Sequence, residues 1–197
     1  MALSTSQLQT LKAAINANPV WAAFPQNSDG YFNLAAVLNV TAVPAFTVWR
    51  TETPTNAIID AINLAGYTPN DTILDADSGD LLQRKNGRLL TSQTKQMNLQ
   101  ILLQGRDKLD CSKALVRSNL RDAVIQLPTG TGGAMTSPGG ASGATTLTVC
   151  TRLATEAEKI LAAPAQGSDT TGTVAARVLG FEGKLSAADV QAARELP

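Results

Sequence analysis

The stretch from Leu127 to Leu147 reads LPTGTGGAMTSPGGASGATTL, and its six glycines raise the question of a phosphate-binding loop. Such loops present backbone N–H groups at a helix start and usually add a lysine. Met135 stands where the third glycine of the dinucleotide-binding pattern belongs, and no lysine or arginine occurs from Asp122 to Thr151. We therefore predict a flexible loop over residues 128–144, either a disordered insertion or a segment that becomes ordered against a neighbouring subunit.

The acidic stretch DADSGD, Asp75 to Asp80, resembles a calcium-binding loop at first sight. The EF-hand pattern requires glycine at its sixth position and glutamate at its twelfth. Counted from Asp75, those positions hold Asp80 and Asn86. We interpret the stretch as a solvated turn without a metal.

Lys113, Arg117 and Arg121 are spaced four residues apart, which places them in one stripe on a helix. Such a stripe is either a solvated face or a surface for an acidic partner or for DNA. We predict that it points away from the core and contacts an acidic surface of another subunit or DNA that passes nearby. Met135 and Phe181 are the other two residues that we assign to such contacts.

The chain has no histidine, which excludes Ser-His-Asp and Cys-His catalytic sites. Cys111 and Cys150 cannot supply the four ligands of a structural zinc site. The N-terminal residues MALSTSQ show no signal peptide, so we expect two buried, reduced thiols rather than a disulfide. No metal set or pair of catalytic carboxylates emerges, and we predict a protein that is not an enzyme and uses no cofactor.

The composition is that of a globular chain. Of 197 residues, 44% are hydrophobic, enough for a sizeable core, and no apolar run could span a bilayer. Sixteen basic and sixteen acidic residues cancel, so the net charge does not indicate nucleic acid or an acidic membrane as a partner.

Periodic apolar residues predict helices, with capping boxes at Ser4 and Ser186. The segment 43–52 fits either a strand or a helix, and we favour helix; the stretches TIL and RLL within 67–90 suggest a hairpin. The strongest pattern predicts that Leu153, Ala157 and Leu161 are buried on one helix. The predicted helices cover residues 4–18, 31–39, 53–65, 92–104, 111–126, 147–161 and 186–196.

We therefore predict a mainly α fold, a helical bundle of about six helices with a long Gly-rich loop and at most one short β-hairpin. The predicted domains are a helical domain over residues 1–163 and, over residues 164–197, a linker with a C-terminal arm that carries a short helix.

Four blocks carry a resemblance to a known family. They read FNLAAVLNVTAVPAFTVWRTETP (32–54), LDCSKALVRSNLRDAV (109–124), LATEAEKILAAPAQGSD (153–169) and LGFEGKLSAADVQAARELP (179–197). Together they resemble proteins encoded among the capsid and neck genes of tailed bacteriophages. The resemblance weakens over residues 67–90, and the glycine-rich loop looks like an insertion.

The resemblance implies a head–tail connector, also called an adaptor, located in the neck of the virion. Such subunits form a ring of about twelve copies beneath the portal protein and join the capsid to a tail, tail-terminator or stopper protein, with DNA passing through the channel. The alternative from a different class is a soluble helical regulator that binds nucleic acid through Lys113, Arg117 and Arg121. The zero net charge argues against this alternative, because nucleic-acid-binding proteins usually carry a basic excess.

Overall fold

A computed structural model describes residues 3–67, 79–125, 146–162 and 169–197, and the chain divides into two compact units. Unit 1 comprises Met1–Val48, Arg152–Ser168 and Arg177–Pro197, and unit 2 comprises Trp49–Thr151 and Asp169–Ala176. Helices predominate in the described residues, which confirms the mainly α class. The helices are divided between the two units rather than gathered in one, because the chain passes from one unit to the other at 48/49, 151/152, 168/169 and 176/177.

Unit 1 is built from helices that begin at well-formed caps. The Ser4 and Gln7 side chains form the predicted capping box of α1, and the Asn18 side chain caps α2 after α1 has ended. In α3, the Asn27 side chain accepts from the Gly30 amide at 2.8 Å. The helices of unit 1 are α1 (Thr5–Ala17), α2 (Pro19–Ala22), α3 (Ser28–Leu38), α8 (Glu156–Leu161) and α9 (Ala187–Glu195).

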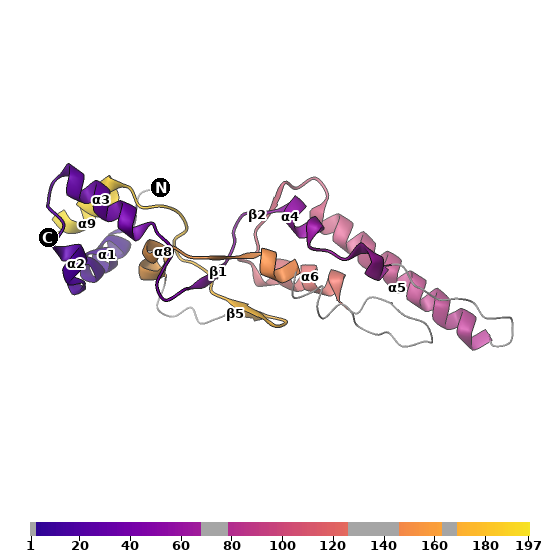
Figure 1. Cartoon of the computed structure of the whole chain (residues 1–197). Helices are drawn as coiled ribbons and strands as arrows, with labels where there is room; N and C mark the ends of the chain where they lie inside the picture. The colour runs from indigo at the N-terminus through magenta and orange to yellow at the C-terminus, as the bar shows by residue number, and fades with distance from the viewer. Residues whose placement is uncertain (1–2, 68–78, 126–145, 163–168) are drawn as a thin grey trace. The chain divides into compact units, whose positions relative to one another are not determined.

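The core of unit 1 lies where α9 packs on α1 and α3 and where α8 packs on α1, a group of helices visible together in Figure 1. Burial of large aliphatic side chains from segments distant in sequence stabilises this contact, at about 1.5–3 kcal/mol for each fully buried side chain. The predicted burial of Ala157 and Leu161 is confirmed here. The core residues are Leu11, Ile15, Tyr31, Leu34, Ala35, Leu38, Ala157, Leu161, Leu185, Val190 and Ala193.

The C-terminal segment belongs to this core and is not an arm. Ser186 and Asp189 form the predicted capping box of α9, and Val190 and Ala193 are fully buried. Phe181, predicted to contact a partner, is half-buried and packs against the same core. The boundary predicted at 163/164 therefore does not coincide with the division of the structure, in which residues 177–197 complete unit 1.

The helix predicted over 147–161 is interrupted. Helical residues 146–149 are followed by strand β4 (Thr151–Leu153), and a new capping box between Thr155 and Glu158 starts α8. The Ala154 amide donates to the carbonyl of Phe46 at 2.8 Å, a bond that a continuous helix would not make. Leu153 is consequently 52% exposed, and the prediction that it is buried is wrong.

The segment 43–52, for which we favoured helix, contains a strand instead. β1 (Thr47–Trp49) pairs with β4, and the division between the units falls within both strands. β-branched and aromatic residues suit a pleated surface, and here the pairing partner decides between two nearly equal local preferences.

A buried carboxylate ties three segments of unit 1 together. Glu158, whose side chain is 2% exposed, accepts two hydrogen bonds of 2.7 Å from the Arg152 guanidinium. It also accepts from the backbone amides of Thr155 at 2.9 Å and Gly183 at 3.0 Å, and Arg152 contacts Glu182 as well. Burial alone would raise the pKa of Glu158, but these hydrogen bonds and the Arg152 charge outweigh it and hold the pKa below its usual value.

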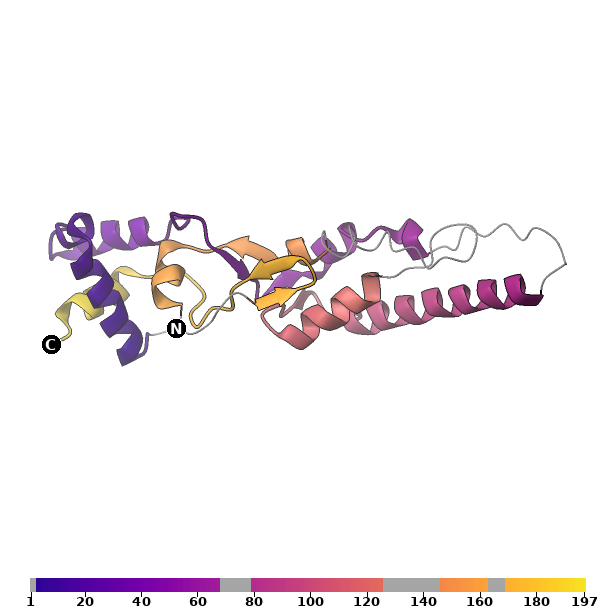
Figure 2. The ribbon, with the colours of Figure 1, turned by 90° about the horizontal axis from the view of Figure 1, so that it is seen from below.

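Unit 2 combines helices with short antiparallel strands. β2 pairs with β3, and β5 with β6 form a hairpin. Helices α5 and α6 lie side by side in Figures 1 and 2 and make an extensive contact. The elements of unit 2 are β2 (Thr53–Pro54), α4 (Thr55–Asp60), the 3-10 helix η1 (Leu64–Tyr67), α5 (Gly79–Leu103), β3 (Lys108–Leu109), α6 (Ala114–Val124), β5 (Asp169–Thr171) and β6 (Val174–Ala176).

The second strand of the hairpin predicted within 67–90 is wrong, because RLL lies in α5, which begins at Gly79. TIL lies outside the described residues. Ile58, Ile62 and Leu99 are buried in unit 2. Gly105, two residues after the end of α5, has φ +69°, a left-handed conformation that glycine adopts without steric cost.

Gly30 gives a first test of the packing in unit 1. A Cβ at this position would lie 1.9 Å from the carbonyl oxygen of Pro25, so Gly30→Ala forces the backbone apart at the start of α3. We expect a loss of about 3 kcal/mol in the free energy of unfolding, at the upper end of overpacking effects. Urea unfolding followed by Trp21 fluorescence in a Trp49→Phe background measures it, since Trp21 packs on the unit 1 core.

The matched control is Ser28→Ala, an exposed position on the same helix, which should change the free energy of unfolding by less than about 0.5 kcal/mol. Equal stability of the Gly30→Ala variant and the parent would contradict the close approach of α3 to Pro25.

Candidate interaction surface

The predicted basic stripe is not a continuous exposed surface. Arg117 is fully buried, with its guanidinium 4.4 Å from the centre of the Trp49 ring. It lies three and seven residues before Leu120 and Val124, which are also fully buried, so it belongs to the inner face of α6. The prediction that Arg117 points away from the core is wrong.

The buried guanidinium is satisfied by backbone and hydroxyl groups. One terminal nitrogen donates to the carbonyls of Cys111 at 2.8 Å and Ser112 at 2.7 Å, and Nε donates to the Thr171 hydroxyl at 3.1 Å. Arg117 thereby joins α6 to the turn that precedes it and to β5. Burial lowers the pKa of Arg117, but a guanidinium remains charged at neutral pH.

The two other basic residues are on the surface, each beside a carboxylate. The Lys113 ammonium lies 3.3 Å from Asp110, and the Arg121 guanidinium lies 3.4 Å from Asp122. Exposed pairs of this kind contribute little to stability. With Arg117 removed from the surface, two locally balanced cations remain, which is a weak signal for DNA or for an acidic partner.

Cys111 and Cys150 are free and buried, as predicted. The two thiols interact with each other, and Cys150 Sγ also donates to the Thr146 carbonyl oxygen at 3.5 Å. The interaction between the two thiols lowers the pKa of Cys111, whereas the same interaction and burial raise the pKa of Cys150. The pair lies inside unit 2 and is not accessible to a substrate.

Other sequence candidates have no described site. Met135 and the glycine-rich loop lie outside the described residues, as do residues 75–78 of the acidic stretch. Among the residues that the structure does describe, no three histidine, cysteine or acidic side chains gather to hold a metal. No helix within the described ranges is long and apolar enough to cross a membrane.

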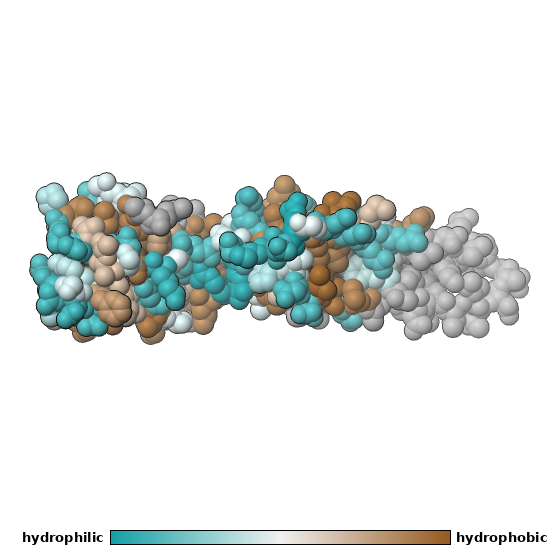
Figure 3. All heavy atoms as spheres, turned by 90° about the horizontal axis from the view of Figure 1, so that it is seen from above, coloured by the Kyte–Doolittle hydropathy of each residue, from teal (hydrophilic) through white to brown (hydrophobic). Residues whose placement is uncertain are grey.

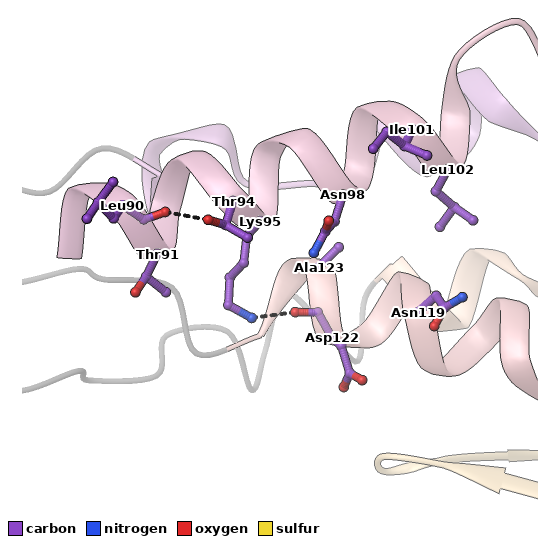
Figure 4. Close-up of a pocket in the computed structure, with 10 residues that line it drawn as sticks. All are labelled: Leu90, Thr91, Thr94, Lys95, Asn98, Ile101, Leu102, Asn119, Asp122 and Ala123. Carbon is purple, nitrogen blue, oxygen red and sulfur yellow. Dashed lines mark hydrogen bonds between the residues drawn. The ribbon is translucent and has the colours of Figure 1, made fainter. Parts of the chain in front are cut away.

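A groove of about 720 Å³ lies between α5 and α6 (Figure 4). Its charged lining residues are Lys95 and Asp122, and the Lys95 ammonium donates to the main-chain carbonyl of Asp122. Burial lowers the pKa of Lys95, and the Asp122 charge partly offsets this effect. The lining contains no nucleophile with a neighbouring base, so the groove lacks the arrangement of a catalytic site.

The rim of this groove carries an unusual run of exposed apolar residues. Leu90, Met97 and Ile101 are 63%, 60% and 65% exposed, and with Thr94 they follow the 4-3-4 spacing of a coiled-coil seam. We call these four residues the α5 crest. At 3.6 residues per turn, the crest lies roughly 180° around α5 from buried Leu99.

A second groove, of about 580 Å³, follows the other flank of α5, against α4 and η1. We call it the α4–α5 groove. Its lining includes the apolar side chains of Ile59, Leu64, Tyr67, Leu99 and Leu103, and its α5 edge carries Gln96, Gln100 and Gln104, spaced one turn apart. In Figure 3, hydrophobic residues gather over the part of unit 2 that holds α4 and α5.

The sequence contains a signal for this surface that periodicity alone does not reveal. From Leu89 to Gly105, Lys95 is the one charged residue in seventeen. Solvated helices normally carry charges on their outer face. A helix that exposes leucine, methionine and isoleucine between amides and hydroxyls has the composition of a protein–protein contact.

No family model, curated protein or solved structure matches this chain.

Proposed function

We propose that this protein is a structural assembly subunit, a head–tail connector (adaptor) of a tailed bacteriophage that forms a ring beneath the portal and joins the capsid to the tail. The observation that carries the assembly role is the α5 crest, three large apolar side chains left exposed on a nearly uncharged helix. The four sequence blocks that resemble phage neck proteins supply the place of assembly, in the neck of the virion.

The alternative role as a nucleic-acid-binding regulator loses its main support. It depended on a ridge of three exposed cations, and the central one, Arg117, is buried. The α5 crest and the α4–α5 groove are uncharged, whereas nucleic-acid surfaces require clustered lysine and arginine. A contact with other protein surfaces suits the α5 crest better.

The test is deletion of the gene in the phage that encodes it, followed by complementation from a plasmid. We expect DNA-filled heads and separate tails to accumulate without the protein, as seen by electron microscopy, and tailed particles to return with the wild-type chain. Tailed, infectious particles at normal yield without the protein would overturn the connector role.

A pair of variants tests the surface within the same experiment. Met97→Lys combined with Ile101→Lys places two charges on the α5 crest and should prevent complementation, since burying an unpaired charge in an interface is unfavourable. Val20→Lys, at an equally exposed apolar position of unit 1, is the matched control and should complement. Both variants change exposed side chains, so both should fold, which circular dichroism verifies.

A further inference from the structure

The α5 crest and the α4–α5 groove lie on different sides of α5, so the crest cannot enter the groove of its own chain. The crest lies on the outer side of α5, and the groove lies on its flank, with Gln96, Gln100 and Gln104 between them. Within the part of the chain that the structure describes, both surfaces remain exposed to solvent. Leu64, on the far wall of the groove, is 65% exposed.

The two surfaces are alike in chemistry, because both are apolar. The crest is a ridge of apolar side chains, and the groove is an apolar channel that runs along about two turns of the same helix type. Interfaces of this kind insert side chains of one helix between those of another surface. A ridge from one copy is therefore a suitable occupant for the channel of another.

The absence of charge from both surfaces favours an uncharged surface as the partner. Neither the four crest residues nor the groove lining contains a charged side chain. The glutamine amides at the groove edge and the crest neighbours Gln93 and Asn98 are each both donor and acceptor, so they can pair with one another at the border of a contact. Nucleic acid, an anionic surface or a charged peptide would find no counter-charge here.

We propose that the α5 crest of one copy packs into the α4–α5 groove of a second copy of this chain. The contact joins two different patches, which makes it heterologous, and a repeated heterologous contact closes a ring when its rotation permits. The proposal rests on the assembly role proposed above and adds the surfaces that meet. It predicts that each copy offers one crest and one groove, so that every groove is filled in a closed ring.

Cysteine cross-linking tests the pairing directly. Met97→Cys places a thiol on the crest, and Leu64→Cys places one in the groove of a separate chain. The two purified variants are mixed and treated with a mild oxidant such as diamide, and products are separated on non-reducing gels and identified by mass spectrometry. Cys111 and Cys150 are buried, so the wild-type chain serves as the background.

We expect the mixture to give at least about tenfold more cross-linked dimer than either variant alone, because a specific contact holds the thiols at a high effective concentration. A chain with both substitutions should give a ladder of multimers. The matched control mixes Leu64→Cys with Val20→Cys, which lies on unit 1, and should remain at background.

Two outcomes overturn the proposal. Cross-linking of Met97→Cys with itself, in excess of the mixture, would show that crest packs on crest. A mixture that stays at the level of the Val20→Cys control would show that crest and groove do not meet. These results are independent of the gene deletion: cross-linking together with normal tailed particles would retain the contact and reject the connector role.

Discussion

Arg117→Glu is expected to lower the free energy of unfolding of unit 2 by about 4 kcal/mol or more, which is a large part of the stability of an ordinary domain. The substitution replaces a buried cation with a buried anion that faces the carbonyl oxygens of Cys111 and Ser112. Those two acceptors lose their donor, and the carboxylate finds no partner in place of the Trp49 ring.

Trp49 reports this directly. In a Trp21→Phe background the remaining tryptophan is the one against Arg117, so its fluorescence during urea unfolding follows unit 2. Arg117→Lys keeps the charge but loses the planar set of donors, and we expect a smaller loss of about 2 kcal/mol.

Arg121→Glu is the matched control, because this side chain is on the same helix and exposed. Its effect should stay below about 1 kcal/mol. Equal effects at positions 117 and 121 would contradict the inward orientation of Arg117.

Glu158→Ala is expected to cost unit 1 about 3–5 kcal/mol, the range found when one partner of a buried ion pair is removed. The variant leaves Arg152 with Glu182 and the Leu153 carbonyl, and it removes the acceptor of the Thr155 and Gly183 amides, so it loosens β4, α8 and the segment before α9 together. Urea unfolding followed by Trp21 in the Trp49→Phe background measures it. Glu195→Ala, at an exposed position of α9, should change stability by less than about 0.5 kcal/mol.

The lowered pKa of Glu158 fixes the direction in which its contribution to stability changes with pH. Its pKa is lowered in the folded chain, so the stabilisation is fully present above the unfolded value of about 4.3 and is lost as the pH falls through the folded value. The difference in unfolding free energy between the wild type and Glu158→Gln should therefore be largest at neutral pH and shrink in acid. A difference that stays constant from pH 7 to pH 3 would contradict a charged Glu158 in the fold.

Local sequence signals predicted the parts of this protein that depend on neighbours along the chain. The capping boxes at Ser4 and Ser186 hold because serine, glutamine and aspartate satisfy free amides within one turn, whatever packs around them. Gly105 ends α5 because a left-handed residue costs glycine little. The amphipathic spacing that gave the mainly α class is of the same local kind.

Tertiary contacts decided the rest. The apolar residues from Leu147 to Leu161 fit one helix, yet the carbonyl of Phe46 captures the Ala154 amide and β1 pairs with β4, so the helix breaks and Leu153 turns outward. From the spacing alone we placed Arg117 on the surface, because charged residues are seldom fully buried. Only the fold supplies the two carbonyls, the Thr171 hydroxyl and the Trp49 ring that make its burial favourable.

The candidate site divides in the same way. That α5 carries one charge in seventeen residues from Leu89 to Gly105 is written in the sequence, and so is the spacing of Leu90, Met97 and Ile101. The sequence did not indicate which side of α5 would be buried, because Leu99 and the crest residues are similarly apolar. In the part of the chain that the structure describes, Leu99 is buried where α5 packs on its neighbours, whereas the apolar crest side chains stay exposed.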